Sequence, residues 1–478
     1  MQYFLKPWAH QMDAINQARF MRNFALFFEV GAGKTLTAIN IHRHWCAQEN
    51  KMLSALVIGV PAIVKQWQEE YHKNSKIGAL TVPLTGSSTK RLKMVEEAMA
   101  KKNKQPGSIF ITNYHCLLMP KVMNALKQHG IDVLICDESQ RIKNPTAKMT
   151  KSVIDFSKHI PRKMILTGTP VLRNPMDLFS QFLVLDGGES FGTNFFVFRA
   201  KYFFDKNAGM PKHKYFPDWR VRPGALDEIK RKMEAKSVVV KKEDCLDLPP
   251  LVKQKYEVEL SPEQKKAYKE MKADLVAYIE NRAAVATMAL TKSLRLQQIV
   301  SGFVTTEDLD GNKKDHIFEK VPRLKALKEI LEDLHEEHKI IVWACFKNNY
   351  AGIRGVLDGL NINHVEITGE LSAKQKQESI EAFRKDPSIR VCVANPRAGG
   401  VGINLTEASY SIYYSKTYSL EDDIQSEARN YRGGSEQHSK VTRIDLVSPG
   451  TIDEVILDAL RKKKDLSEYI LALDKTKF

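Results

Sequence analysis

The sequence lacks the paired cysteines that a disulfide-stabilised scaffold or a zinc site would need. Its six cysteines are scattered along 478 residues, and no two have the close spacing of a metal-ligand pair. This usage fits reduced thiols better than disulfides. We therefore expect no zinc and no structural disulfide; the cysteines are Cys46, Cys116, Cys136, Cys245, Cys345 and Cys392.

Long hydrophobic runs are also missing. The longest, SALVIGVPAIV at 54–64, is shorter than the roughly 20 residues that a membrane-spanning helix needs. The start, MQYFLKPWAH, does not have the basic and then apolar pattern of a secretory signal. We therefore expect a cytoplasmic protein that is neither secreted nor embedded in a membrane.

Acidic residues are too few to balance the basic ones. The chain has 73 Lys and Arg against 57 Asp and Glu, for a net charge of +16. Such an excess concerns partners rather than fold. Nucleic acid is the leading candidate, because neutralising phosphates releases counterions and gives affinity without sequence preference. A generically basic, solvated surface is the alternative, and charge alone does not decide between them.

Two stretches of the chain share one rhythm, in which short apolar strands alternate with helical segments. Continuous Val, Ile and Leu runs of this kind are typical of parallel strands buried on both faces. The sequence therefore predicts an α/β fold with two tandem parallel-sheet lobes. The expected strands are 24–30, 55–60, 108–112, 132–137 and 163–168 in the first lobe, and 339–345, 363–368, 389–395, 410–415 and 441–447 in the second.

Residues 188–320 have a different texture. They are aromatic and basic at first, and from Ser261 onward they are rich in strong helix formers. We expect helical insertions and an inter-lobe linker here, between a first lobe at 1–187 and a second lobe at 321–478. The stretch that begins at Thr451 has an amphipathic helical pattern, and we expect it to pack as a brace against a lobe.

The stretch FFEVGAGKT at 27–35 places a glycine turn between an expected strand and an expected helix. Backbone N–H groups and the helix dipole at such a turn bind anionic oxygens. A strict phosphate loop has a glycine where this chain has Phe28, so a chance glycine turn is the alternative. In the nucleotide-site interpretation the residues at the phosphates are Gly31, Ala32 and Gly33, with Lys34 for the β- and γ-phosphates and Thr35 for Mg²⁺.

An acidic pair follows the fourth expected strand. VLICDES at 133–139 puts Asp137 and Glu138 at the carboxyl end of a buried strand, where open α/β sheets bind ligands. Asp137 would hold Mg²⁺, and Glu138 would orient and activate the attacking water. A solvated acidic pair is the alternative for an isolated Asp-Glu, but the preceding phosphate loop makes it much the weaker one.

At this point the chain resembles a known family. EVGAGKT, DESQRIKN and LTGTP resemble motifs I, II and III of superfamily 2 helicase-like ATPases, and most closely the Swi/Snf branch of double-stranded DNA translocases. LKPWAHQ at 5–11 resembles that branch's first motif, in which Gln11 would bind the adenine. Family members usually have Ala and His after the Asp-Glu pair, where this chain has Ser139 and Gln140. A glutamine there can still hydrogen-bond toward Thr167 or Thr169.

The second lobe carries two further motifs. ANPRAGGVGINLTEA at 394–408 resembles motif V, and QSEARNYRGGSEQ at 425–437 resembles motif VI. The resemblance implies nucleotide binding by Gln425 and arginine-finger roles for Arg429 and Arg432, which would lie three apart on one helical face. By themselves, two surface arginines paired with Glu427 or Glu436 are the alternative.

The resemblance also implies phosphate contacts to DNA from both lobes. Trp67, in the segment that resembles motif Ia, is expected to be a core or wedge residue rather than a base-stacking platform. In the second lobe the alternative for 367–383 is an ordinary helix capped by Ser372. The expected DNA contacts are Lys65, Thr112, Thr368, Gly369, Arg397, Gly399 and Gly400.

Taken together, the resemblance implies two RecA-like lobes that use ATP and Mg²⁺ to translocate on double-stranded DNA without sequence specificity, and to remodel protein–DNA or branched DNA structures. We expect a monomeric motor and leave open a protein partner for targeting. The compact chain favours a prokaryotic or viral source. A strand-separating DNA or RNA helicase is the second hypothesis, and a pseudo-ATPase that only scaffolds DNA is the third.

Overall fold

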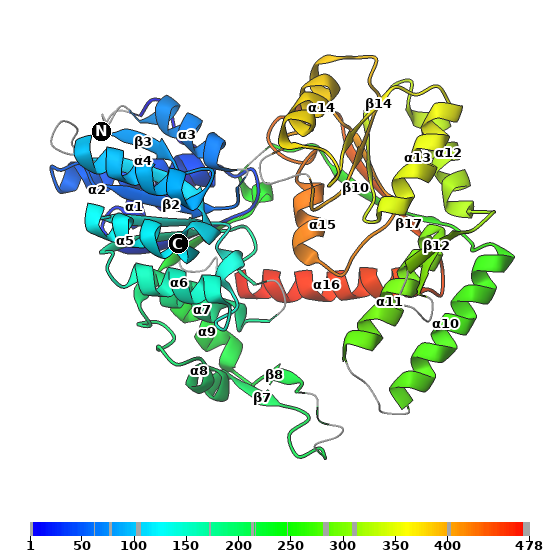
Figure 1. The fold of residues 1–478 in the computed structure, drawn as a ribbon, viewed down its shortest axis with the longest axis horizontal. Helices are drawn as coiled ribbons and strands as arrows, with labels where there is room; N and C mark the ends of the chain where they lie inside the picture. Colours follow the sequence, from blue (N-terminus) through cyan, green and yellow to red (C-terminus); the bar gives the residue numbers. More distant parts are fainter. Residues whose placement is uncertain are drawn as a thin grey trace. The chain divides into compact units, whose positions relative to one another are not determined.

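The structure is a computed structural model that describes residues 3–61, 63–75, 79–101, 107–171, 174–211, 215, 217–245, 247–280, 286–307, 313–398 and 403–471. The chain divides into two compact units (Figure 1). Unit 1 is residues 1–246 with 465–478, and unit 2 is residues 247–464.

Unit 1 contains a seven-stranded sheet in the order β3-β4-β2-β5-β6-β1-β9, and every pairing in it is parallel. The central strands are buried along their whole length, as expected for strands covered on both faces. The strands are β1 (Asn23–Phe28), β2 (Ala55–Gly59), β3 (Leu80–Pro83), β4 (Ser108–Asn113), β5 (Val133–Asp137), β6 (Arg162–Leu166) and β9 (Ser237–Val240).

Helices cover this sheet, and the side chains of several of them join one buried apolar cluster with the strands. A small antiparallel ribbon, β7 (Phe203–Asp205) with β8 (Trp219–Val221), extends from the same unit. The helices are α1 (Ala9–Ala18), α2 (Lys34–Gln48), α3 (Ile63–Asn74), α4 (Ser88–Lys101), η1 (Tyr114–Leu118), α5 (Pro120–His129), η2 (Ser139–Ile142), α6 (Lys148–Ser157), α7 (Asp177–Asp186), α8 (Phe195–Tyr202), α9 (Ala225–Glu234) and η4 (Lys242–Asp244).

Unit 2 contains a six-stranded sheet in the order β10-β17-β16-β13-β15-β14, again parallel throughout. An antiparallel pair, β11 with β12, lies apart from it. The strands are β10 (Leu251–Glu257), β11 (Phe303–Glu307), β12 (Lys313–Ile317), β13 (Ile340–Trp343), β14 (His364–Ile367), β15 (Val391–Ala394), β16 (Tyr410–Tyr413) and β17 (Val441–Val447).

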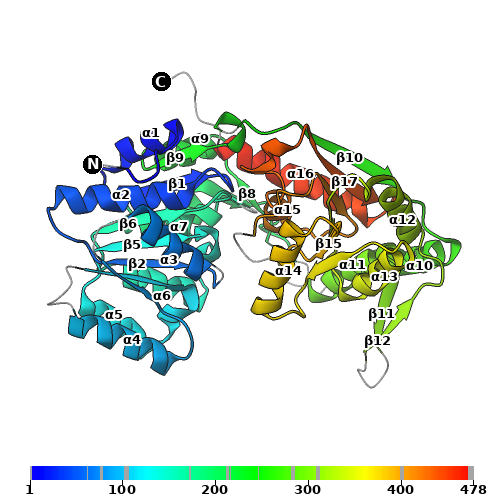
Figure 2. The same cartoon turned by 90° about the horizontal axis from the view of Figure 1, so that it is seen from above.

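The alternation of side chains along β13 separates two cores. Ile340 and Val342 join the cluster under α12 and α13, whereas Ile341 and Trp343 join the cluster under α14. Figure 1 shows α12 beside α13, contacts between these two helices support the view, and Figure 2 shows the same sheet from above. The helices of unit 2 are α10 (Pro262–Glu280), α11 (Ala286–Ser301), α12 (Pro322–Leu334), α13 (Lys347–Gly359), α14 (Ala373–Lys385), α15 (Leu420–Glu427) and η5 (Ser435–Gln437).

The predicted fold class is confirmed, since all ten expected strands lie in two parallel sheets. Besides the antiparallel pairs β7–β8 and β11–β12, three strands of these sheets were not expected: β3, β9 and β10. The last two fall within 188–320, where only helical insertions and a linker were predicted, yet β9 pairs with β1 and β10 pairs with β17. The units therefore divide at 246/247 rather than at 187 and 320, because each half of that segment adds a strand to a different sheet.

The C-terminal stretch forms one long helix, α16 (Ile452–Leu471). Its apolar residues Ile452, Ile456 and Leu460 pack in a cluster with residues of α10 and α11. The Tyr268 hydroxyl accepts a hydrogen bond from the Ile452 N–H at 2.8 Å. Within unit 2 this helix therefore braces the α10–α11 pair.

In the part of the chain that the structure describes, no helix combines the length and the apolar character needed to cross a membrane.

Replacing Ile456 by alanine should lower the free energy of unfolding by about 2–5 kcal/mol, because it leaves a cavity among buried side chains. The neighbouring Val455 is 54% exposed, so Val455→Ala should change it by less than about 0.5 kcal/mol. Urea titrations followed by circular dichroism would compare the two variants. Equal effects would contradict the packing of α16 on α10 and α11.

Candidate active site

The glycine turn of unit 1 has the backbone of a phosphate loop. It connects β1 to the first residue of α2, and Gly31 and Gly33 have φ of 95° and 81°, which only glycine adopts without strain. Because α2 begins at Lys34, its first N–H groups and the positive end of its dipole lie at this turn. The turn can therefore bind the oxygens of a phosphate chain.

The Lys34 ammonium lies over the loop. Its Nζ donates hydrogen bonds to the carbonyl oxygens of Phe28 at 2.8 Å and of Glu29 at 3.2 Å. The position where a strict phosphate loop has glycine thus offers a carbonyl to the lysine, which any residue can do. This explains why Phe28 is compatible with the loop.

Gln11 supports the loop from α1. Its side chain is 2% exposed, its Oε1 accepts from the Trp8 N–H at 2.8 Å, and its Nε2 donates to the Gly33 carbonyl at 3.2 Å. A Cβ on Gly33 would lie 2.0 Å from that Nε2, so only glycine allows this approach. The loop is also held through Ala32, whose carbonyl oxygen lies 2.9 Å from His10 Nε2. Adenine binding by Gln11 stays a prediction.

Asp137 ends β5 at the carboxyl edge of the sheet, between β2 and β6. Its two carboxylate oxygens each accept one hydrogen bond, Oδ2 from Trp67 Nε1 at 2.8 Å and Oδ1 from the Glu138 N–H at 2.9 Å. Burial, and then the neighbouring Glu138 carboxylate, raise the pKa of Asp137 above its usual value, while the Lys34 ammonium acts in the opposite direction. A carboxylate in this position gains by binding a cation.

Glu138 is held by a chain of hydrogen bonds. It has a left-handed backbone with φ of 52°, which is uncommon for a residue other than glycine. Gln140 Nε2 donates to Glu138 Oε2 at 2.6 Å, and the Thr167 hydroxyl donates to Gln140 Oε1 at 2.6 Å. The expected bond from Gln140 toward Thr167 is therefore present, and Thr167 Oγ1 also accepts from the Thr169 N–H at 3.0 Å.

Ser139, the other departure from the family pattern, makes a second connection to the same turn. Its hydroxyl donates to Gln181 Oε1 at 2.7 Å, and Gln181 Nε2 donates to the Pro170 carbonyl at 2.7 Å. A Cβ on Gly168 would lie 3.0 Å from the Phe28 carbonyl oxygen, so glycine lets this turn approach the phosphate loop. The LTGTP turn thus contacts both the acidic pair and the loop.

The residues expected to hold Mg²⁺ fit that ion. Mg²⁺ prefers carboxylate and hydroxyl oxygens, and each Asp137 oxygen has accepted only one hydrogen bond from the described residues. Thr35 lies in the first turn of α2, next to Lys34. Asp137 and Thr35 would hold the ion, which supplies neutralising charge to the phosphates when bound.

Two residues that hold Asp137 were not predicted. Besides the Trp67 indole, the buried Tyr114 hydroxyl donates to the Asp137 carbonyl oxygen at 2.8 Å. Trp67 was expected to be a core or wedge residue, and it is 1% exposed. The available signal was chemical, since a buried Trp or Tyr normally finds a partner for its polar hydrogen.

In unit 2 the two arginines of motif VI do not share a helical face, so that expectation is wrong. Helix α15 ends at Glu427, and both Arg429 and Arg432 lie in the irregular segment that follows. The reason is a tertiary hydrogen bond, because the Arg429 carbonyl accepts from the Leu405 N–H at 2.9 Å instead of continuing the helix.

Arg429 is buried within unit 2, and Arg432 is half-buried. Arg429 is 3% exposed, and one of its guanidinium nitrogens donates to the Ile403 carbonyl at 3.4 Å. Burial lowers the pKa of Arg432, and its Nε has no hydrogen-bond partner among the described residues. Of the two acidic residues in the surface-pair alternative, Glu427 pairs with Arg443 and with Lys253, and Glu436 Oε2 accepts from the Gly434 N–H.

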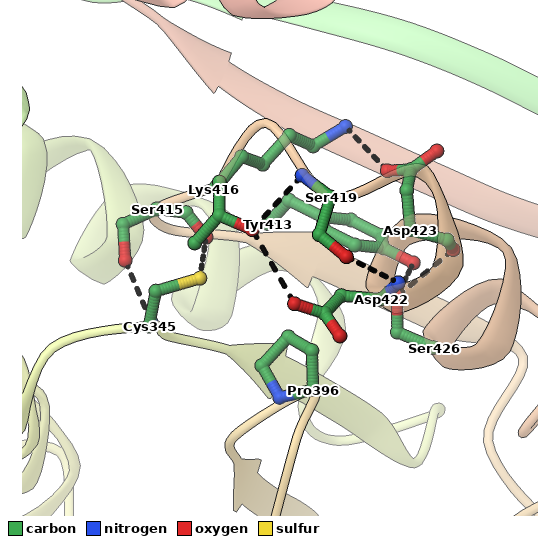
Figure 3. A pocket seen from close by; sticks show the side chains of 10 residues that line it. Cys345, Pro396, Tyr413, Ser415, Lys416, Ser419, Asp422, Asp423 and Ser426 are labelled. Carbon is green, nitrogen blue, oxygen red and sulfur yellow. Dashed lines mark hydrogen bonds and ion pairs between the residues drawn. The ribbon is translucent and has the colours of Figure 1, made fainter. Parts of the chain in front are cut away.

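A network of buried charges anchors α15 to the sheet of unit 2. The Arg443 side chain is 4% exposed and forms ion pairs with Asp423 and Glu427 of α15, each at 2.7 Å, and with Asp445 at 3.2 Å. Lys416 pairs with Asp423, as Figure 3 shows, and also with Asp445. Burial alone would raise the pKa of Asp423, but the Lys416 and Arg443 charges outweigh it and hold that pKa well below its usual range.

This network places the residues on α15. Ser419 caps the helix by accepting from the Asp422 N–H at 3.1 Å, and the hydroxyls of Tyr413 and Ser426 lie 2.9 Å apart, as Figure 3 shows. Gln425, expected at the nucleotide, lies half-buried in the same helix, with its Nε2 3.5 Å from Glu421 Oε1. The start of motif VI is therefore rigidly attached to unit 2.

The residues expected at DNA fall into two groups. Lys65 has an 85% exposed side chain, Arg397 has a 69% exposed side chain that pairs with Asp422 at 2.8 Å, and Gly369 is exposed. Thr112 and Thr368 are fully buried instead. Gly399 and Gly400 lie outside the described residues.

Tertiary contacts explain the burial of Thr112. Its hydroxyl donates to the Leu84 carbonyl at 3.1 Å and accepts from Arg91 at 3.0 Å, so it satisfies groups inside unit 1. The Thr368 hydroxyl has no hydrogen-bond partner among the described residues. Neither hydroxyl lies at the surface, as a direct phosphate contact would require.

A phosphate loop and an Asp-Glu pair at the carboxyl edge of a parallel sheet define the class of P-loop nucleotide-binding proteins. The model of the SNF2-related domain matches residues 15–303, and that of the helicase conserved C-terminal domain matches residues 322–434. The chain belongs to the SNF2-related family.

Two relatives, from Arabidopsis and yeast, are much longer than this chain. It is 26% identical to the CHD3-type chromatin-remodeling factor CHR7 of Arabidopsis thaliana, over 97% of this chain and 37% of that protein. It is 24% identical to the DNA repair and recombination protein RDH54 of Saccharomyces cerevisiae, over 93% and 50%. The chain thus spans half or less of the length of these relatives.

Among solved structures, the Sulfolobus solfataricus SWI2/SNF2 ATPase core in complex with dsDNA is 26% identical with a TM-score of 0.44, over 98% of this chain and 93% of that one. A second structure, the Sulfolobus solfataricus SWI2/SNF2 ATPase core domain, is 25% identical with a TM-score of 0.41, over 99% of this chain and 95% of that one.

Replacing Gln140 by leucine should reduce ATP turnover by about 10- to 100-fold, the usual cost of removing a supporting hydrogen bond at a catalytic centre. The change removes the donor to Glu138 and the acceptor for Thr167 while keeping the bulk. ATP binding should change by less than about twofold, since no phosphate-loop residue is altered. Steady-state phosphate release would measure the turnover, and equilibrium binding of a fluorescent ATP analogue would measure the affinity.

The control is Gln140→His, which keeps one donor and one acceptor and should retain most of the turnover. Wild-type turnover in the leucine variant would show that the chain of hydrogen bonds does not orient Glu138.

Proposed function

We propose that the protein is an ATP-dependent motor that hydrolyses ATP to translocate along double-stranded DNA and remodel protein–DNA or branched DNA structures. The observation that carries the proposal is the Asp137–Glu138 pair, held beside the phosphate loop by Trp67, Gln140 and the LTGTP turn. Membership of the SNF2-related family supports the same assignment.

The roles in hydrolysis follow from the chemistry of each group. The N–H groups of the loop and the Lys34 ammonium bind the β- and γ-phosphates, and Thr35 and Asp137 hold Mg²⁺. Glu138 accepts a proton from the water that attacks the γ-phosphorus, and ADP leaves with the bridging oxygen. Gln140 keeps the Glu138 carboxylate in position for that water.

Arg429 and Arg432 supply the cationic side of the reaction. We assign Arg432 to the transferred phosphoryl group, because its buried Nε has no partner among the described residues of unit 2 and its pKa is lowered by burial without a carboxylate to compensate. A guanidinium in that condition gains by meeting an anion. Gln425, on the rigidly anchored α15, is assigned to the nucleotide as well.

Movement along DNA requires that ATP binding and hydrolysis be coupled to changes in the contacts with DNA. If ATP is bound better by one arrangement of the units than by another, each cycle of binding and hydrolysis shifts the population between them. The exposed Lys65, Arg397 and Gly369 are the candidates for gripping phosphates. Phosphate contacts carry no base information, so binding should be sequence-independent and strongly weakened by salt.

The kind of work done on DNA is inferred from the relatives. The names of the proteins from Arabidopsis and yeast refer to chromatin remodeling and to DNA repair and recombination. A motor that displaces proteins or moves branch points on duplex DNA serves both descriptions. The net charge of +16 agrees with a nucleic-acid partner.

A strand-separating helicase of superfamily 2 is the second candidate. ATP turnover measured in parallel with duplex DNA, single-stranded DNA and RNA separates the two, and duplex DNA should stimulate most. A second assay would measure displacement of a third strand from a DNA triplex and separation of the strands of a duplex. We expect the protein to displace the third strand without separating the duplex. A preference for RNA would overturn the proposal.

Replacing Glu138 by glutamine should leave ATP binding intact and slow hydrolysis by at least about 100-fold, because a neutral amide cannot take the proton from water. Lys34→Ala should abolish hydrolysis. Equilibrium binding of a fluorescent ATP analogue and phosphate release would distinguish the two effects. Normal turnover in either variant would show that the site is misassigned.

Arg432→Ala should lower duplex-stimulated turnover by about 10³-fold or more, the range found for arginine fingers, while nucleotide affinity stays within severalfold of wild type. The matched control is Arg384→Ala, since Arg384 is a half-exposed arginine of the same unit that pairs with Glu407. Removing it should change turnover less than twofold. Similar losses in both variants would count against the finger assignment.

A further inference from the structure

Asp137 is held by two segments of unit 1 that precede it in the chain. The first is α3, whose Trp67 indole donates to the Asp137 carboxylate at 2.8 Å. The second is η1, whose Tyr114 hydroxyl donates to the Asp137 carbonyl oxygen at 2.8 Å. Helix α3 follows β2 and carries Lys65, which the sequence resemblance places at DNA, and η1 follows β4.

Helix α3 joins an exposed surface to the buried carboxylate. Lys65 and Trp67 are two residues apart, which is about 200° around a helix, so they point to opposite sides. The Lys65 side chain is 85% exposed, whereas Trp67 is 1% exposed. The Lys65–Glu69 ion pair at 3.8 Å is exposed and worth little, so a phosphate can compete for the lysine.

Close packing leaves little slack between α3 and Asp137. Gly59 ends β2 just before the helix, and a Cβ there would lie 2.2 Å from Ile63 Cδ1 and 3.3 Å from Asp137 Cβ. The side of Asp137 that faces α3 is therefore filled by Ile63 and Trp67. A displacement of the helix reaches the carboxylate directly, because packed interiors transmit shifts rather than absorb them.

From this arrangement we infer that Trp67 and Tyr114 are positioning residues for Asp137, and that contact of α3 with duplex DNA acts through Trp67 to set the orientation of the Asp137 carboxylate that would hold Mg²⁺. The inference rests on the proposed function. It adds a route, confined to unit 1, by which DNA stimulates ATP turnover.

The sensitivity of the metal explains why a small movement is enough. Mg²⁺ requires nearly ideal octahedral geometry, and each Asp137 oxygen accepts one hydrogen bond in a fixed direction. The Trp67 N–H therefore decides which lone pair of Oδ2 remains for the ion. Supporting bonds of this kind typically change metal affinity or activity by about 10- to 100-fold.

The test replaces Trp67 by phenylalanine, which removes the N–H and keeps a buried ring. The variant should need about tenfold more Mg²⁺ for half-maximal binding of a nonhydrolysable ATP analogue, followed by isothermal titration. The ratio of ATP turnover with saturating duplex DNA to turnover without DNA should fall severalfold. Tyr114→Phe should shift both quantities in the same direction by less, because its bond reaches the backbone rather than the carboxylate.

The matched control is Trp45→Phe. Trp45 is also fully buried in unit 1, but its indole donates to the Ala18 carbonyl at 3.3 Å, and it lies near the end of α2 opposite Lys34. Its Mg²⁺ requirement and its stimulation ratio should match those of the wild type. Thermal unfolding of both tryptophan variants would show whether the loss of an N–H bond costs them similar stability.

The outcomes separate the two proposals. If wild-type protein hydrolyses ATP with duplex DNA and Trp67→Phe has the same Mg²⁺ requirement and stimulation ratio, the inference is overturned while the proposed function stands. The same follows if Trp45→Phe shifts both quantities equally. If wild-type protein shows no duplex-stimulated turnover at all, the proposed function fails and the inference fails with it.

Discussion

The buried carboxylate of Asp137 sets the requirements that its surroundings in unit 1 satisfy. A carboxylate taken out of water needs hydrogen-bond donors and a nearby positive charge, and here these come from the Trp67 indole, the Glu138 N–H and the Lys34 ammonium. The two donors and the positive charge come from three segments. Around Asp137, α3, the end of β5 and the phosphate loop therefore lie close together. The remaining lone pairs of the Asp137 carboxylate oxygens are available to bind a metal ion.

In the described part of unit 2, one buried arginine is surrounded by carboxylates, and another, half-buried arginine is not. Arg443 is surrounded by Asp423, Glu427 and Asp445, and this network serves to attach α15 firmly to the sheet. Arg432, a few residues beyond that helix, is half-buried, its buried Nε has no partner among the described residues, and burial lowers its pKa. The first arrangement holds a helix to the sheet, and the second is the basis of the role proposed for Arg432.

Local pattern was sufficient for much of the fold and of the nucleotide half-site. The apolar runs of the central strands, the glycine turn before Lys34 and the acidic pair after β5 are contiguous features, so each could be recognised within a few residues. The four-residue β9 and the largely exposed β10 could not, because their place depends on pairing with β1 and β17. The end of α15 at Glu427 likewise depends on a bond from Leu405 to Arg429.

The sequence by itself determined which chemical groups are available: a phosphate loop with its lysine, an acidic pair, a glutamine in place of the usual histidine and two arginines. Only the tertiary structure decided which of them point inward, placing Thr112 and Thr368 in the interior and leaving Lys65 exposed. It alone joined Trp67 and Tyr114 to Asp137 across 70 and 23 positions of the chain. The physical reason is that a hydrogen bond between distant residues leaves no periodic trace in the sequence, whereas a strand or a turn does.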